Sequence, residues 1–115
     1  MDIQISTDHN IEGHEAMAAE TTDVVARALR QFSDHITRVE VHLGDENGPK
    51  AGQDDMRCML EARMEGRPPI AVTHHADTIQ LAVEGAADDL VALIEHTLGL
   101  PEALRRAERK KPLQE

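Results

Sequence analysis

The sequence predicts an α+β fold in which two helices pack on one face of a four-stranded mixed sheet, in the order β-α-β-β-β-α. Apolar residues recur at helical spacing in two stretches, residues 14–31 and 77–98. They alternate with polar residues in four shorter stretches, which is the pattern of half-buried strands. Each of these elements has one apolar face to cover, and a two-layer sandwich covers them all.

In the N-terminal part, a strand over 1–6 is followed by a helix over 14–31 and a strand over 36–43. The first strand places Ile3 and Ile5 on one face. The helix carries one apolar stripe, made by Met17, Thr21, Val24, Val25, Ala28 and Phe32. The second strand places Val39, Val41 and Leu43 on one face and Arg38, Glu40 and His42 on the other. A strand, a helix and a strand in this order predict a right-handed crossover with parallel pairing.

The C-terminal part begins with residues 44–53, a Gly- and Pro-containing stretch that predicts a long hairpin loop. A strand over 55–65 and a strand over 70–76 then complete an antiparallel meander. Asp77, with Gln80 three residues later, predicts a capping box at the start of the second helix. Gly99 predicts its end. In the strand over 55–65, alternation separates a core side, Met56, Cys58, Leu60, Ala62 and Met64, from an outer side, Arg57, Met59, Glu61 and Arg63.

The charge is strongly acidic and unevenly distributed. Twelve Lys and Arg residues oppose 22 Asp and Glu residues, which gives a net charge of −10. Five of the twelve basic residues fall in the last eleven positions. We therefore expect one folded domain over residues 1–99 and a basic, flexible tail over residues 100–115. So acidic a body repels nucleic acid at long range, and any contact with it would have to come from local basic clusters.

Several functional classes are excluded by what the sequence lacks. A single cysteine, Cys58, cannot form an internal disulfide, which fits a reducing compartment. The N-terminus has no signal-peptide pattern, and no apolar run approaches the ~18 residues of a membrane span. We expect a cytoplasmic protein with no membrane contact. Because no nucleophile elbow, Gly-rich phosphate loop or paired buried carboxylates are present, we also expect no enzymatic activity and no cofactor.

Seven histidines raise the question of a metal site. His74 and His75 are adjacent in a predicted strand and should point to opposite faces. His42 would approach one of them across the sheet. No C-x-x-C or H-E-x-x-H spacing supports a ligand set, so the sequence predicts no metal site.

Two phrases carry a resemblance to a known family. "FSDHITRVEVHL" from Phe32 and "IAVTHHADTIQLAV" from Ile70 resemble the ribosome hibernation-promoting factor family, which includes ribosome-associated inhibitor A and is also called the sigma-54 modulation family. The resemblance covers about residues 1–98. It implies a fold akin to double-stranded RNA-binding domains. It also implies a non-catalytic, ribosome-associated factor that binds the small ribosomal subunit and restrains translation under stress.

The resemblance further implies that Lys and Arg side chains on both helices contact ribosomal RNA, and here the chain departs from the family. Residues 78–98 contain no Lys or Arg. Asp89, Val91 and Ala92 stand where relatives carry basic residues. The candidate RNA-binding residues that remain are Arg27, Arg30, Arg38, Lys50, Arg105, Arg106, Arg109, Lys110 and Lys111.

Two interpretations of these charges stay open. In the first, the candidate residues bind the ribosomal RNA of the small subunit. In the second, Arg27, Arg30 and Arg38, with Lys50 in the loop, only belong to a solvated surface of mixed charge that includes Glu20, Asp23 and Glu40. The basic tail then only aids solubility or neutralises the acidic body. The chain would then be a divergent acidic module that kept the fold, lost ribosomal RNA binding and binds a basic protein.

Overall fold

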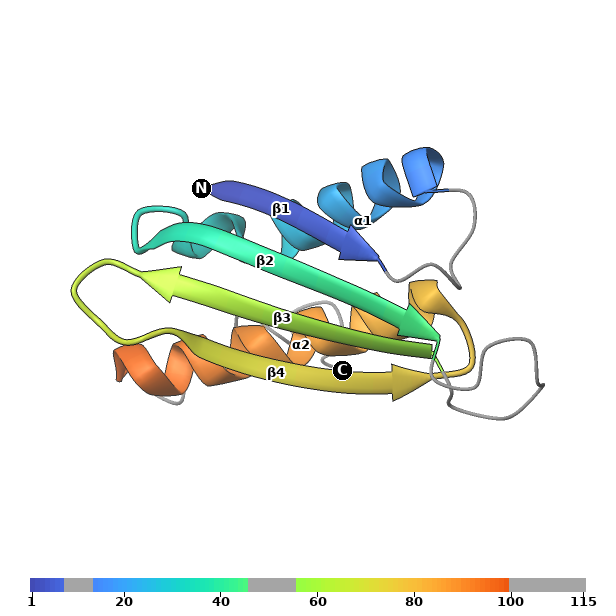
Figure 1. The fold of residues 1–115 in the computed structure, drawn as a ribbon. Coiled ribbons are helices and arrows are strands. Elements are labelled where there is room, and N and C mark those ends of the chain that lie inside the picture. The colour runs from blue at the N-terminus through green and yellow to red at the C-terminus, as the bar shows by residue number, and fades with distance from the viewer. Residues whose placement is uncertain (8–13, 46–55, 100–115) are drawn as a thin grey trace, which may run out of the picture.

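The computed structural model describes residues 1–7, 14–45 and 56–99, and its element order confirms the predicted β-α-β-β-β-α arrangement (Figure 1). Most of the predicted hairpin loop and all of the basic tail lie outside the described residues. The elements are β1 (Asp2–Thr7), α1 (His14–Leu29), a 3₁₀ turn η1 (Arg30–Phe32), β2 (Ile36–Asp45), β3 (Met56–Met64), β4 (Ile70–Ala76) and α2 (Ile79–Leu98).

The four strands form one mixed sheet in the order β1-β2-β3-β4. β1 pairs with β2 in parallel, and the pairs β2–β3 and β3–β4 are antiparallel, as predicted. The register aligns core-facing side chains in rows across the sheet, such as Ile5, Val41, Leu60 and Val72. The one irregularity in these ladders lies between Ile36 and Arg38 on β2.

Both helices cover the same face of the sheet, and no other described element covers the opposite face, which we call the open face (Figure 1). α2 lies over β3 and β4, while α1 contacts β1 and α2. No helix among the described residues is long and apolar enough to cross a membrane. Between the layers lies an aliphatic core with a single aromatic residue. Its buried apolar side chains are Val25, Leu29, Phe32, Ile36, Val39, Val41, Leu43, Cys58, Leu60, Ala62, Met64, Ala76, Ala82, Val83, Ala86, Ala87, Leu90, Val91 and Ile94.

The start of α2 differs from the prediction. Thr78, not Asp77, is the N-cap, and its Oγ1 accepts a hydrogen bond from the backbone N–H of Leu81 at 3.1 Å. The capping-box prediction is therefore wrong, because the third helical position is Leu81, whose side chain cannot return a hydrogen bond. Gln80 instead contacts Glu84 along the helix.

The ends of the two helices are set by different devices. Gly99 ends α2 in the left-handed conformation, with φ of 71°, and its N–H donates to the carbonyl of His96, which confirms the predicted stop. α1 ends at Leu29, two residues earlier than predicted. The 3₁₀ turn that follows carries Phe32 into the core.

A side-chain contact fixes α2 on β4. The imidazole of His74 on β4 lies against Gly85 of α2, so closely that a Cβ on Gly85 would collide with the ring. The Nδ1 of His74 also lies 3.0 Å from Oδ2 of Asp89, one helical turn further along α2. Glycine at position 85 is therefore explained by packing against the His74 ring and not by backbone conformation.

We expect the effect of Gly85→Ala on the free energy of unfolding to change sign when His74 is also replaced. In the wild type the added methyl displaces the His74 ring, which should cost about 1–3 kcal/mol, the usual range for overpacking. In a His74→Ala background the same change should be neutral or stabilising by up to about 1 kcal/mol, because Ala is the better helix former. Urea unfolding of the four proteins in this double-mutant cycle checks the prediction. An equal effect of Gly85→Ala in both backgrounds would contradict it.

Cys58 lies on β3 with no exposed surface, which confirms its predicted core position. Burial raises the pKa of its thiol from 9.0 to about 12, and nearby Arg57 offsets this only in part. Because the folded state favours the protonated thiol, the stability it contributes is fully present below pH 9.0 and is lost as pH rises toward 12.

The thiol of Cys58 should consequently be inert in the native protein at neutral pH. A pKa near 12 instead of 9.0 lowers the thiolate fraction by about a thousandfold, and the thiolate is the reactive form. We expect alkylation by iodoacetamide at pH 8 to be at least a hundredfold slower in buffer than in 6 M guanidinium. Comparable labelling rates in the two conditions would show that the strand opens readily.

Candidate nucleic-acid interface

The described candidate residues do not form one cluster. Arg27 on α1 and Arg30 in η1 belong to the helix layer. Arg38 lies on β2, on the open face of the sheet. Lys50 and the five tail candidates, Arg105, Arg106, Arg109, Lys110 and Lys111, lie outside the residues that the structure describes.

Arg27 is already engaged within its own helix. Its guanidinium lies 2.9 Å from Oδ2 of Asp23 one turn earlier, and its Nε donates to the backbone carbonyl of the same residue. Both side chains are more than half exposed, so this ion pair contributes little stability and can be broken at little cost. Arg30 is exposed, and its side chain bonds to no residue in the described part of the chain.

Arg38 is held in a network across β1 and β2. Its Nη2 donates to Oε1 of Gln4 at 2.9 Å and lies 3.1 Å from Oε2 of Glu40. The other oxygen of Glu40 faces the Nε2 of His42 at 3.6 Å. This is the charge-paired surface that the second interpretation anticipated for Arg38 and Glu40, yet the Arg38 side chain remains 41% exposed.

The open sheet face brings together basic residues that sequence reasoning did not select as candidates. Arg63 on β3 lies directly opposite Arg38. Arg57 lies near the other end of β3, opposite Gly44. Alternation had placed both on the outer side. The proximity of Arg63 to Arg38 became visible only through the register of the β2–β3 pairing. Two like charges opposite each other are unfavourable unless an anion separates them.

The two faces of the molecule differ in charge. The open sheet face carries three arginines and three carboxylates, Asp2, Glu40 and Glu61. The exposed surface of the helix layer carries two arginines and six carboxylates, Glu15, Glu20, Asp23, Glu84, Asp88 and Asp89. Within the described residues, the sheet face is thus the side less repulsive to a polyanion.

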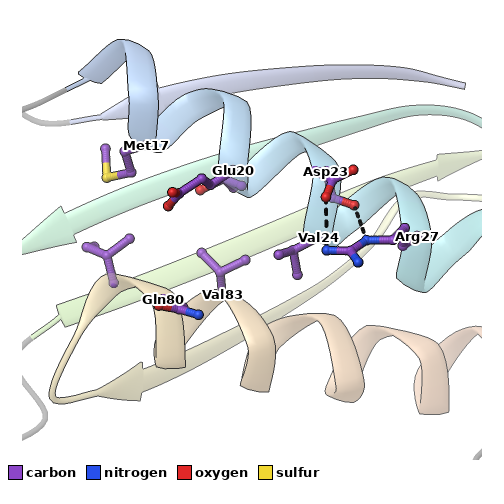
Figure 2. A pocket seen from close by; sticks show the side chains of 9 residues that line it. Met17, Glu20, Asp23, Val24, Arg27, Gln80 and Val83 are labelled. Carbon is purple, nitrogen blue, oxygen red and sulfur yellow. Dashed lines mark hydrogen bonds and ion pairs between the residues drawn. The ribbon is translucent and has the colours of Figure 1, made fainter.

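A groove of about 330 Å³ runs between α1 and α2 on the helix side (Figure 2). Aliphatic side chains from both helices line it, with Val24 and Val83 facing each other between Met17 and the Arg27–Asp23 ion pair. Its polar lining includes the carboxylates of Glu20 and Asp23 and the amide of Gln80. The groove is also lined by the Arg27 guanidinium, which pairs with Asp23, so its border carries one net negative charge. This mixture suits a ligand that combines aliphatic and basic side chains.

Three histidines, His42, His74 and His75, lie on the sheet and do not gather there. His42 lies in a row with Met59 and Thr73, so the predicted approach to His74 or His75 does not occur. His74 faces the helix layer through Gly85 and Asp89. In the described part of the chain, no three His, Cys, Asp or Glu side chains gather in a way that could hold a metal ion.

No family model and no curated protein sequence matches this chain. Solved structures do match. The N-terminal domain of Protein Y from Thermus thermophilus aligns with a TM-score of 0.67 at 18% identity, covering 84% of this chain and 99% of that domain. A ribosomal subunit interface protein from Coxiella burnetii aligns with a TM-score of 0.71 at 13% identity, covering 86% of this chain and 99% of that protein.

Both matched proteins are members of the ribosome hibernation-promoting factor family. The fold that the two sequence phrases implied is therefore confirmed over nearly the whole of each matched protein. The chain has the α+β fold of ribosomal subunit interface proteins.

Proposed function

We propose that this chain is a non-catalytic, cytoplasmic, ribosome-associated factor that binds ribosomal RNA of the small subunit and restrains translation under stress. The observation that carries the proposal is the structural match to a ribosomal subunit interface protein along its whole length. The sequence phrases "HITRVEV" and "HHADTIQLAV" point independently to the same family. The sequence phrases and the structural match thus support the same function.

The charge distribution supports contact through the open sheet face and the basic tail, with the helix layer turned away. Each phosphate contact contributes about one unit to the slope of log affinity against log salt. Six exposed carboxylates on α1 and α2 would oppose such contacts, whereas Arg38 and Arg63 lie side by side on the sheet. Residues 100–115 add five basic side chains against three acidic ones, and we propose that they act as an RNA-contacting arm.

Sedimentation with ribosomes tests this function. We expect the wild-type protein to travel with 30S or 70S particles at low salt and to be released as salt rises. Replacing Arg105, Arg106, Arg109, Lys110 and Lys111 together by Ala should remove up to about five units from the salt slope and weaken binding accordingly. The charge-neutralising variant Glu84→Gln/Asp88→Asn is the matched control, and it should bind as well as the wild type or better.

Protein that stays at the top of the gradient at low salt, with ribosomes taken from stationary-phase cells, would overturn the proposal. The double substitution Arg38→Gln with Arg63→Gln tests whether the open sheet face or the helix layer contacts the ribosome. Loss of binding in that pair supports the sheet face. Loss confined to Arg27→Gln with Arg30→Gln would place the contact on the helix layer instead.

The acidic groove between α1 and α2 favours a second candidate function, a module that binds a basic protein. Two added lysines on its border, Glu20→Lys, which reverses a charge, with Gln80→Lys, which adds one, should then abolish capture of a discrete partner from a ribosome-depleted extract. Glu61→Lys on the opposite face of the sheet is the control and should leave capture unchanged. If ribosomes alone are recovered and the border variant behaves like the wild type, this candidate is rejected.

A further inference from the structure

We propose that the chain forms a homodimer through the free edge of β4, with β4 of a second copy pairing antiparallel to it in one continuous eight-stranded sheet. β4 lies at one end of the strand order, and within the described residues it has a partner strand on one side only (Figure 1). The inference stands apart from the ribosomal function, since it concerns the purified protein alone.

The β4 edge lacks the devices that normally prevent strand pairing. Edge strands are usually blunted by charged residues, by Pro or by a β-bulge. Ile70–Ala76 contains no Asp, Glu, Lys, Arg or Pro, in a chain of which 30% is charged. Its register with β3 runs without a bulge from Ala76 to Ile70. β1, the other edge, carries Asp2 and a hydrogen bond from Gln4 to that carboxylate.

Symmetry fixes where the two copies can meet. Side chains directly opposite each other in an antiparallel pair lie on the same face of the sheet. A two-fold axis perpendicular to the sheet also keeps each face on its own side. A residue on the open face must therefore lie opposite another residue of the open face. This holds only if one residue lies directly opposite its own symmetry mate, with the axis midway between the two. Full overlap of the seven residues puts Thr73, the middle residue, on the axis.

The ends of the strand are complementary in this register. Exposed Arg67 lies just before β4 and exposed Asp77 just after it. Antiparallel pairing about Thr73 places Arg67 of one copy near the end of the strand from which Asp77 of the other copy emerges, and the same happens at the opposite end. Within one copy the Arg67 guanidinium donates to the carbonyl of Thr97 at 3.3 Å, so it would turn from that carbonyl to meet Asp77. The edge is thus uncharged along its length and carries opposite charges at its two ends.

The helix layer leaves room for this arrangement. α2 packs on both β3 and β4, so its axis lies between them. With strands about 4.8 Å apart, the two α2 helices of a dimer would be separated by about 10 Å, an ordinary helix-packing distance. Their carboxylates, including Glu84 and Asp88, would then approach each other. Because salt screens this repulsion, the dimer should tighten as salt rises, the reverse of RNA binding.

A cysteine on the proposed axis tests the register. Thr73→Cys should form an intermolecular disulfide under mild oxidation, because residues opposite each other have Cα atoms about 4.5–5.5 Å apart, within disulfide range. Ala71→Cys, on the same strand and face, is the matched control. Its symmetry mate would lie four residues away along the strand, at about 14 Å, and should not cross-link. Gln4→Cys reports on the β1 edge, and buried Cys58 stays silent.

Sedimentation equilibrium of the full chain gives the second readout. We expect a monomer–dimer equilibrium that shifts toward dimer with salt, and at least a tenfold weaker dimer for Thr73→Lys, which sets two like charges opposite each other. Circular dichroism and urea unfolding should show that this exposed substitution leaves the fold intact. Monomers at every concentration and salt would overturn the proposal and mean that another partner or another part of the chain covers the edge. Cross-linking of Ala71→Cys or Gln4→Cys equal to that of Thr73→Cys would overturn it too.

Discussion

The structure depends on the burial of one face of β3 beneath α2. Cys58, Leu60 and Ala62 have no exposed surface, and each lies in a row with core residues of the neighbouring strands. With Phe32 as the only aromatic residue, the core consists of small and branched side chains whose fit depends on close approach of the layers. The contact of the His74 ring with Gly85 is one result of that close approach. This contact sets the position of α2 on β4 and thereby sets which α2 residues face the solvent.

One-sided burial also divides the molecule into two chemically distinct faces. The apolar faces of the two helices fill the core, so the charge of their solvent-facing surfaces can vary without changing the fold. In this chain those surfaces are acidic, and Asp89 on α2 contacts His74 of β4. The open face of the sheet contributes nothing to the core either, and it carries Arg38, Arg57 and Arg63. Fold and charge are therefore separable here, and a shared fold need not imply a shared binding face.

The sequence predicted most of the fold because periodicity reports directly on burial. The alternation in β3 assigned all five core-facing side chains correctly, Met56, Cys58, Leu60, Ala62 and Met64, although Met56 is only partly buried. The N-cap was missed because Asp77 and Thr78 are both good capping residues and the choice depends on one backbone conformation. The contact of His74 with Asp89 was out of reach, since it joins a strand and a helix across fifteen residues.

The candidate site was predicted less well, because a site depends on which strands lie side by side. Choosing Arg38 but not Arg63 reflects this limit, since the two meet only through the β2–β3 register. The same register leaves β4 as an outer strand, and the composition of Ile70–Ala76 then gains a meaning that it lacks in the linear sequence. An uncharged strand within a sheet is ordinary, whereas an uncharged strand at an edge invites pairing. Topology thus converts the same seven residues from an unremarkable strand into an interaction surface.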